Sequence, residues 1–212
     1  MKKILFLDTL ATGLNPERCA IYNVGGILCE ETLETMTEIR RFDLRLRPWE
    51  GARVTDNSLW VGGVRRSDLV QYPPQDTVFA AFFKLLESAV AIDNPRDKIY
   101  LSGFNASAFD APFIRNWFFR NDCSRFRDCF FVQTVDLMTL SAFALMNERE
   151  NMPDFHLETA ARFLGVSPTK GERYSCLDNA ETCLKIYLAL KERLLTSPPN
   201  EWIRTEEILK NE

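Results

Sequence analysis

Hydrophobic positions recur with two different periods along the chain. Residues 4–7 form an uninterrupted apolar run of strand length, and residues 20–29 form a second run that contains two adjacent glycines. In residues 41–47 apolar and charged side chains alternate, which predicts a third strand. The apolar face of that strand would hold Phe42, Leu44 and Leu46. Three successive strands with short links favour an antiparallel meander.

Helical periodicity dominates after residue 77. The pattern predicts helices over residues 77–91, from about 110, and over 136–146, 155–166 and 175–195, with strands at 98–102 and 130–135. Residues 48–74 contain several glycines and prolines and are expected to form a long irregular segment with at most short helices. A meander followed by alternating strands and helices indicates an α/β fold, in which helices cover both faces of a mixed sheet.

Length and composition predict the number of domains and the cellular location. The chain has 212 residues, of which 46% are hydrophobic and 12% aromatic, so one domain over residues 1–196 can bury a substantial core. Residues 197–212 are predicted to be an amphipathic tail, with residues 200–212 able to dock on the domain or bind a protein partner. The sequence has no apolar run of about 20 residues and no signal-peptide pattern, so we expect a cytoplasmic protein without membrane contact.

Cysteine and histidine usage argues against metal sites of the zinc type. The six cysteines form no CxxC pair and are too sparse for a disulfide scaffold, so reduced and mostly buried thiols are expected. The only histidine, His156, has no partner at a metal-ligand spacing. A packed or capping residue is therefore the interpretation of His156.

Positive charge is concentrated in one part of an otherwise acidic chain. The net charge of −4 argues against unspecific coating of nucleic acid. The arginines cluster at positions 40, 41, 45, 47, 53, 65 and 66. A solvated edge strand explains this cluster, and a track for phosphate groups is the alternative.

Two short stretches carry candidate chemistry. Asp8 lies at the end of the first apolar run, and a turn at Thr12 and Gly13 follows it. An aspartate there could simply cap the strand end, but the stretch around it resembles the first motif of the DEDD (DnaQ-like) 3′–5′ exonucleases, Asp-x-Glu-x-Thr-Gly-Leu-x-Pro. Asp8, Thr12 and Gly13 match this motif, whereas Leu10 stands at the position of the family's metal-binding glutamate.

The second stretch follows the predicted strand at residues 98–102. Residues 103–113 resemble the family motif Gly-x-Asn-x-x-Phe-Asp-x-x-Phe, with one residue added before Phe109. Asn105, Phe109 and Asp110 occupy motif positions, and Pro112 is well tolerated in a first helical turn. Asp110 is thus expected at a helix N-terminus, where an aspartate would also serve as an ordinary cap.

The resemblance covers roughly residues 4–190 and implies a ribonuclease H-like fold. It implies hydrolysis of phosphodiesters at the 3′ end of a nucleic acid by two divalent ions, Mg²⁺ or Mn²⁺, held by a cluster of carboxylates. Single-stranded nucleic acid or a 3′ end is then the expected partner. Thr12, Gly13, Asn105 and Phe109 would line the nucleic-acid site.

The third motif of the family can be placed in two ways. One register puts Tyr174 at the position of the family's general-base histidine and Asn179 at that of its metal-binding aspartate. The other uses Tyr174 and Asp178, which have the Tyr-x-x-x-Asp spacing of the family's tyrosine branch. Four residues make about one helical turn, so Tyr174 and Asp178 can share a helix face. The sequence leaves both registers open.

The replaced positions limit the chemistry that the resemblance implies. Asp8, Asp110 and, in one register, Asp178 remain as catalytic and metal-binding acids, while Leu10 supplies no charge. Tyr174, with a free pKa near 10, is a poor base at neutral pH. We therefore expect a nucleic-acid-binding protein whose hydrolysis is impaired or lost and which holds one ion weakly or none. A divergent active exonuclease and a protein-interaction module are the alternatives.

Overall fold

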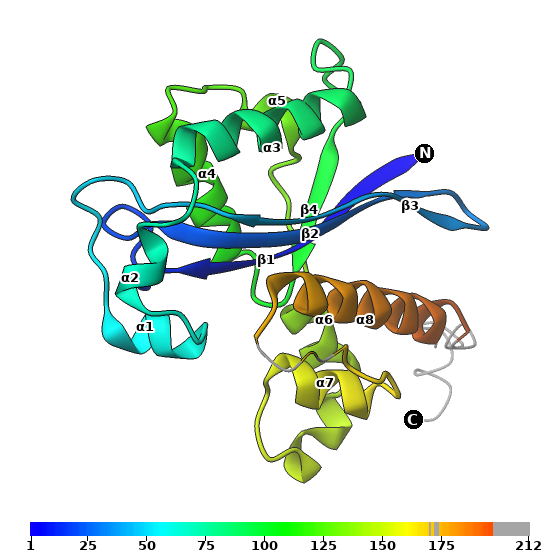
Figure 1. Cartoon of the computed structure of the whole chain (residues 1–212). Helices are drawn as coiled ribbons and strands as arrows, with labels where there is room; N and C mark the ends of the chain where they lie inside the picture. Colours follow the sequence, from blue (N-terminus) through cyan, green and yellow to red (C-terminus); the bar gives the residue numbers. More distant parts are fainter. Residues whose placement is uncertain (170, 172–173, 197–212) are drawn as a thin grey trace, which may run out of the picture.

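In a computed structural model of the chain, which describes residues 1–169, 171 and 174–196, a five-stranded sheet lies between two layers of helices (Figure 1). The strands are β1 (Lys2–Ala11), β2 (Ile21–Glu31), β3 (Met36–Arg45), β4 (Ile99–Gly103) and β5 (Val135–Asp136). Their order is β3-β2-β1-β4-β5. The first three strands pair in antiparallel fashion, whereas β4 and β5 join β1 in parallel. The predicted mixed α/β sheet with a meander is thereby confirmed.

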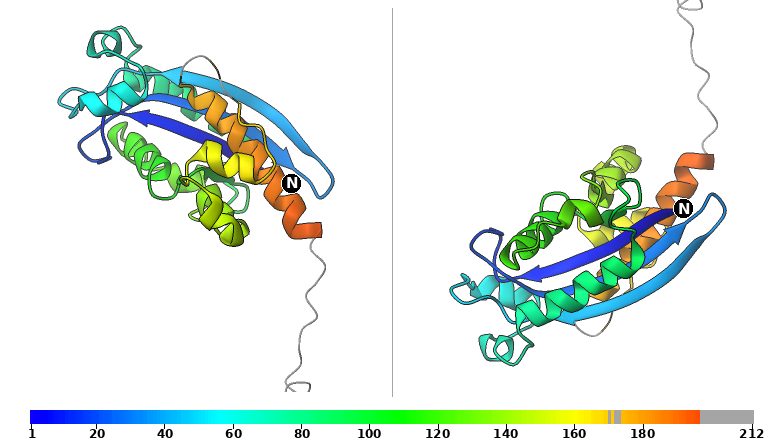
Figure 2. Two further views of the ribbon diagram at one scale, coloured as in Figure 1. Left: turned by 90° about the horizontal axis from the view of Figure 1, so that it is seen from below. Right: turned by 90° about the horizontal axis from the view of Figure 1, so that it is seen from above.

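The helices divide between the two faces of the sheet. The longer ones are α3 (Gln75–Ala89), α4 (Asp110–Arg120), α6 (Leu137–Ala144), α7 (Leu157–Phe163) and α8 (Cys176–Thr196). Three short helices, α1 (Asp56–Val61), α2 (Arg66–Leu69) and α5 (Phe126–Cys129), and a 3₁₀ helix at Met146–Asn151 complete the fold. Figure 2 shows α8 running across one face of the sheet and α3 across the other. Among the described residues, none of these helices has the length and apolarity needed to cross a membrane.

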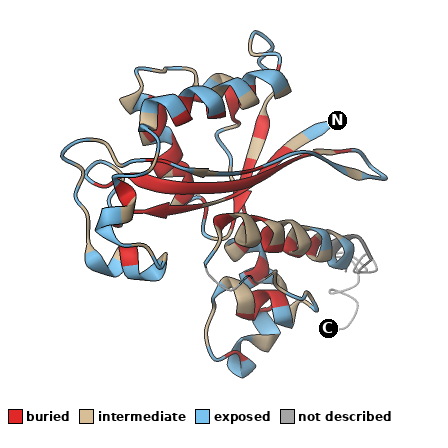
Figure 3. Ribbon diagram, in the orientation of Figure 1, coloured by how far each residue is buried: buried red, intermediate tan, exposed pale blue. Residues whose placement is uncertain are grey.

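Alternation along the strands supplies one core to each helical layer, and Figure 3 shows the sheet buried between them. On one face Leu5 and Leu7 of β1 pack with side chains of α3 and α4, such as Phe82 and Ile114. On the other face Ile4 and Phe6 pack against α8, through a set that includes Ala180, Cys183 and Ile186. The same alternation puts Asp8 and Leu10, which follow Phe6, on the face that α8 covers.

Two predicted strands have different bounds in the structure, and the first of them, expected at 41–47, is β3 over Met36–Arg45. The strand expected at residues 130–135 is reduced to β5, with one isolated bridge between Ile99 and Phe130. The preceding residues 126–129 form α5, and the rings of Phe126 and Phe130 pack on Phe118. The irregular segment 48–74 contains α1 and α2. The predicted tail, 197–212, lies outside the described residues.

The close contact between α8 and the sheet depends on Gly25. A Cβ atom at this position would lie 2.2 Å from the backbone nitrogen of Leu177 and 2.4 Å from the carbonyl carbon of Cys176. Neither backbone atom can move without displacing the start of α8. The next residue, Gly26, faces the opposite layer, where an added Cβ would meet the tip of the Phe42 ring at 2.4 Å.

We expect Gly25→Ala to destabilise the fold more than Gly26→Ala. The first substitution pushes on helix backbone and should cost about 1–3 kcal/mol or more of unfolding free energy, whereas the second meets a ring that can rotate or shift. Urea unfolding followed by circular dichroism measures both values. Equal losses for the two variants would contradict this account of how α8 is seated.

Candidate functional site

Asp8 is the centre of a polar cluster between β1 and the start of α8. Its carboxylate Oδ2 accepts hydrogen bonds from the Tyr174 hydroxyl at 3.1 Å and from the Asn179 side-chain amide at 3.3 Å. Tyr174 lies two residues before the start of α8, and Asn179 belongs to its first turn. The seating of α8 at Gly25 is what brings both side chains to the strand end.

Asp110 approaches the same place from α4. It is the first residue of that helix, it is only 2% exposed, and the hydroxyl of Thr9 donates to its Oδ1 at 2.7 Å. The charge of Asp8 raises the pKa of Asp110, so the two carboxyl groups are close enough to repel each other. The strand end and the helix start therefore bring together the two acids that the first and second motifs predicted.

Burial controls the ionisation of this pair. Desolvation raises the pKa of Asp8 from 3.8 to about 6, and hydrogen bonds from Cys176, Tyr174 and Asn179 offset part of the effect. Desolvation, and then the charge of Asp8, raises the pKa of Asp110 well above its ordinary value, against a smaller opposing effect of the Thr9 hydrogen bond. Ionisation of both acids therefore lowers the stability of the folded protein.

Leu10 occupies an apolar environment next to these acids. It is 7% exposed and packs in a cluster with Tyr22, Leu59, Leu69 and Cys176. These residues tie the strand end to α1 and α2. The position at which the family has a ligand carboxylate is therefore part of a small hydrophobic core.

The geometry distinguishes the two registers of the third motif. Tyr174 and Asn179 contact Asp8, whereas the Asp178 carboxylate accepts a hydrogen bond from the backbone N–H of Gly171 at 2.9 Å. Asp178 thus has its own partner outside the cluster. The arrangement matches the register in which tyrosine and asparagine stand at the family's histidine and aspartate positions.

The predicted nucleic-acid contacts have structural partners of their own. Thr12 is fully buried, and its hydroxyl donates to the Arg53 carbonyl at 2.6 Å and accepts from the Ala20 N–H at 3.0 Å. A Cβ atom at Gly13 would meet the Cys19 sulfur at 2.5 Å. These contacts fix the turn after β1, and a role in binding nucleic acid remains a prediction for both residues.

Asn105 and Phe109 shape the loop that leads into α4. Asn105 has a φ of 66°, a left-handed conformation that asparagine tolerates better than most residues. Phe109 occupies the N-cap position of α4, and its ring packs on Phe113 with a centroid distance of 4.9 Å. Their contact with nucleic acid is likewise a prediction.

Several polar residues of the site were absent from the sequence interpretation. Cys176 is fully buried beside Asp8, and Thr9 holds Asp110. Asp136 accepts hydrogen bonds from the N–H and hydroxyl of Ser107, and it also caps α6. A cysteine or threonine in an apolar stretch is typical of a core, so no signal marked the first two. The Asp136 cap was detectable, because aspartate before a helical pattern favours an N-cap.

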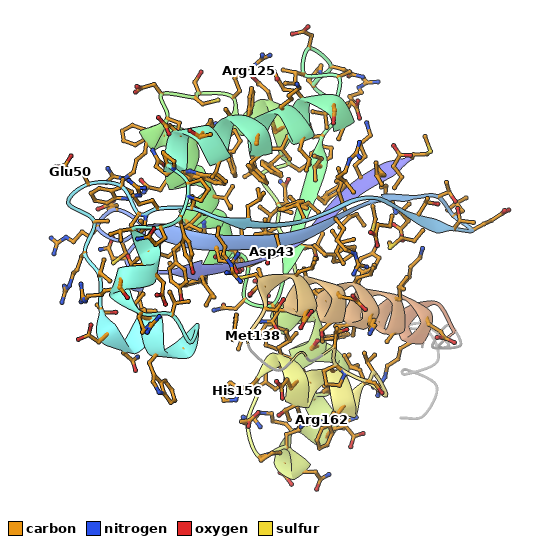
Figure 4. The ribbon with its side chains drawn as sticks, viewed as in Figure 1. Asp43, Glu50, Arg125, Met138, His156 and Arg162 are labelled. Atoms are coloured by element: carbon orange, nitrogen blue, oxygen red, sulfur yellow. The ribbon has the colours of Figure 1, made fainter. Side chains whose placement is uncertain are left out.

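The donor set does not fit a pair of divalent cations. Asp8 and Asp110 are the carboxylates of the cluster, and Leu10 has no oxygen to offer. Across residues 1–169, 171 and 174–196, no three His, Cys, Asp or Glu side chains gather in a way that could hold a metal ion. His156 stands at the N-cap of α7, with its Nδ1 3.3 Å from Asp154 and its side chain 83% exposed (Figure 4), and it lines the same cavity as Tyr174 and Asn179.

The sheet order and the two helical layers define a ribonuclease H-like fold. The chain is similar in structure to E. coli exonuclease I in complex with a dT13 oligonucleotide, with a TM-score of 0.67, 16% identity and coverage of 91% of this chain and 41% of that one. The zinc-bound complex of the E. coli enzyme with single-stranded DNA gives a TM-score of 0.69, 16% identity and the same two coverages. A product-bound exonuclease I gives a TM-score of 0.68 and 15% identity, with coverage of 92% of this chain and 44% of that one.

This likeness is one of structure. No family model and no curated protein matches the sequence. The chain spans about two fifths of the length of the exonuclease I chains, as the coverages of 41% and 44% state. The fold is therefore shared, and the activity of the larger proteins is a matter for experiment.

We expect Asp8→Asn to stabilise the protein at neutral pH in the presence of EDTA. The folded-state pKa of about 6 lies above the ordinary 3.8, so the wild type loses stability as the pH rises between these values. The variant has no such loss, and its melting temperature should exceed that of the wild type by several degrees near pH 7.5, with the difference shrinking toward about pH 4.

Asp97→Asn provides a control with the opposite sign. A backbone hydrogen bond from Ala91 and the Lys3 ammonium, 2.6 Å away, lower the pKa of Asp97. That residue contributes stability above its unfolded pKa and loses it as the pH falls, so its variant should melt lower at neutral pH. If the wild type and Asp8→Asn had the same melting temperature at every pH, ionisation of the buried Asp8 would not destabilise the fold, which would contradict our interpretation.

Proposed function

We propose that the chain binds single-stranded nucleic acid at a 3′ end and that its metal-dependent hydrolysis is impaired or lost. The observation that carries this proposal is the state of position 10, where Leu10 is packed into an apolar cluster beside Asp8. The fold supports the binding half, because the similar exonuclease I structures are complexes with dT13 and dA16 oligonucleotides. The absence of carboxylates at Leu10 and Asn179 supports the second part, that hydrolysis is impaired or lost.

Charge explains why the loss of two ligands matters. Two divalent cations carry four positive charges, which the four carboxylates of the exonuclease family balance. Here Asp8 and Asp110 supply two, while Leu10 and Asn179 supply none. An alkyl group beside a cation forfeits electrostatic attraction and leaves a coordination position empty, so ions such as Mg²⁺ or Mn²⁺ would be held weakly, singly or not at all.

The hydrogen bond of Tyr174 opposes a role as general base. Its hydroxyl donates to Asp8, so its proton is engaged by the acid. Burial and the charge of Asp8 raise the pKa of Tyr174 above its ordinary value of 10. A base that ionises only in strong alkali cannot activate water at neutral pH. Tyr174 instead orients the carboxylate.

Two other functions remain as alternatives that an experiment can separate. A divergent exonuclease would degrade single strands despite Leu10, since Asp8 and Asp110 are still neighbours. A protein-interaction module would use the fold, and the segment 200–212 outside the described residues, without binding nucleic acid. Salt-dependent binding of an oligonucleotide argues against this module, because contacts with phosphate groups release counterions.

The direct test incubates the protein and a 5′-labelled single strand with Mn²⁺ or with EDTA. We expect binding in both buffers, measured by fluorescence anisotropy, and an intact strand on a denaturing gel. Asp8→Ala serves as the matched variant. Degradation by the wild type that disappears in Asp8→Ala would establish the active exonuclease, and the absence of any salt-dependent binding would remove the binding half of the proposal.

A complementary experiment restores the replaced ligands. The double variant Leu10→Glu/Asn179→Asp brings the carboxylates of the pocket to four, so it should bind Mn²⁺ more tightly than the wild type in calorimetry and should gain hydrolysis at the 3′ end. Leu10→Gln/Asn179→Asp is the control, because it carries the same buried polarity without the charge at position 10. A double variant that binds Mn²⁺ no better than the wild type would contradict the assignment of these positions.

A further inference from the structure

A cavity of about 290 Å³ opens beside the polar cluster, between the sheet and the α1–α2 segment. Its wall contains Leu10, Tyr22, Arg45, Gln71, Tyr72 and Tyr174. Tyr174 connects this cavity with the acids, since its hydroxyl is bound to Asp8. The lining combines an apolar floor, three tyrosine side chains and one guanidinium group. Such a mixture is typical of sites for small, planar and charged ligands.

Arg45 differs from Arg41 and Arg65 in its partners. Arg41 forms ion pairs with Glu38 and Glu181 at 2.9 and 2.8 Å, and Arg65 forms one with Asp68 at 3.1 Å. Arg45 forms none with any residue that the structure describes, and its guanidinium lies 5.8 Å from the centre of the Tyr72 ring. Stacking on an aromatic ring orients a guanidinium while leaving its N–H groups free to donate.

The only acid on the cavity wall among the described residues, Asp68, is already neutralised. Its carboxylate accepts three hydrogen bonds from Arg65, including one from the backbone N–H at 3.0 Å. A second cavity, of about 660 Å³, also has Tyr174 in its wall. Its charged lining is Asp154, Glu158, Asp178, His156 and Arg162, and there His156 pairs with Asp154 and Arg162 with Glu158. Among the charged side chains on the wall of the smaller cavity, Arg45 is therefore the one that the described residues leave without an ion-pair partner.

We propose that this smaller cavity binds the 3′-terminal nucleotide unit of a single strand and that Arg45 holds its phosphate group without a divalent ion. A guanidinium can donate two parallel hydrogen bonds to a phosphate, so it supplies locally the positive charge that a metal supplies in a two-metal site. The base lies against the tyrosine rings and Leu10, which accept any base because every base has a stackable face. The alkyl side chain of Leu10 is in this arrangement part of the binding surface.

This inference rests on the proposed function, and its test separates the two. A 5′-fluorescein-labelled oligo(dT) is titrated with protein in EDTA at several salt concentrations, with anisotropy as the signal. The wild type should bind, and Arg45→Gln should weaken binding about tenfold or more, as expected for the loss of a charged hydrogen-bonding partner. The slope of log K against log salt should fall by about 0.7 for the single lost phosphate contact.

Two further variants serve as controls. Arg40→Gln removes an exposed charge from the same strand outside the cavity, and it should leave affinity and slope nearly unchanged. Arg45→Lys keeps the charge but not the paired donors, so it should retain the salt slope and recover only part of the affinity. Thermal melting of all variants checks that the fold is intact, which an exposed position such as Arg45 makes straightforward.

Each other outcome overturns the inference in a recognisable way. Equal effects of Arg45→Gln and Arg40→Gln would show that the cavity arginine has no special role, while binding of nucleic acid itself would stand. Binding that requires Mn²⁺ would show that a metal ion, rather than Arg45, holds the phosphate. No binding under any condition would remove the proposed function and this inference together.

Discussion

The contact between the start of α8 and Gly25 of β2 is the constraint on which the candidate site depends. Because Gly25 has no side chain, helix backbone can lie directly on the sheet, where an added Cβ would stand 2.2 Å from Leu177 nitrogen. This brings Tyr174 and Asn179 within hydrogen-bonding distance of Asp8. The polar cluster thus follows from a packing requirement in the middle of the sheet.

The same seating supplies hydrogen bonds that offset part of the cost of burying Asp8. Asn179 and Tyr174 both donate to a single oxygen of Asp8, which satisfies that oxygen without any ion. Thr9 does the same for Asp110. On the sheet side, Leu10 joins Tyr22 and α1 in a hydrophobic cluster. Hydrogen bonds thus offset part of the energetic cost of burying the two acids.

Much of this architecture could be predicted from the sequence because alternation and motif spacing are local properties. The meander, the strand that carries Asp8 and the helix that begins at Asp110 all appear in the structure. The choice between Asp178 and Asn179 could not be made, since both lie in the first turn of α8 and their directions depend on how the helix is seated. The strand expected at 130–135 was predicted too long, because its aromatic start resembles a strand locally whereas Phe130 packs on Phe118 and forms only one isolated bridge, to Ile99.

The packing of Leu10 also affects which substitutions the chain tolerates at this position. Positions 10 and 179 belong to different elements, β1 and α8, so no single substitution returns both ligands. A charge introduced at position 10 alone would sit among Tyr22, Leu59 and Leu69 before any cation is present to balance it. An apolar side chain packed into this wall therefore makes a carboxylate at position 10 costly unless a positive charge arrives with it.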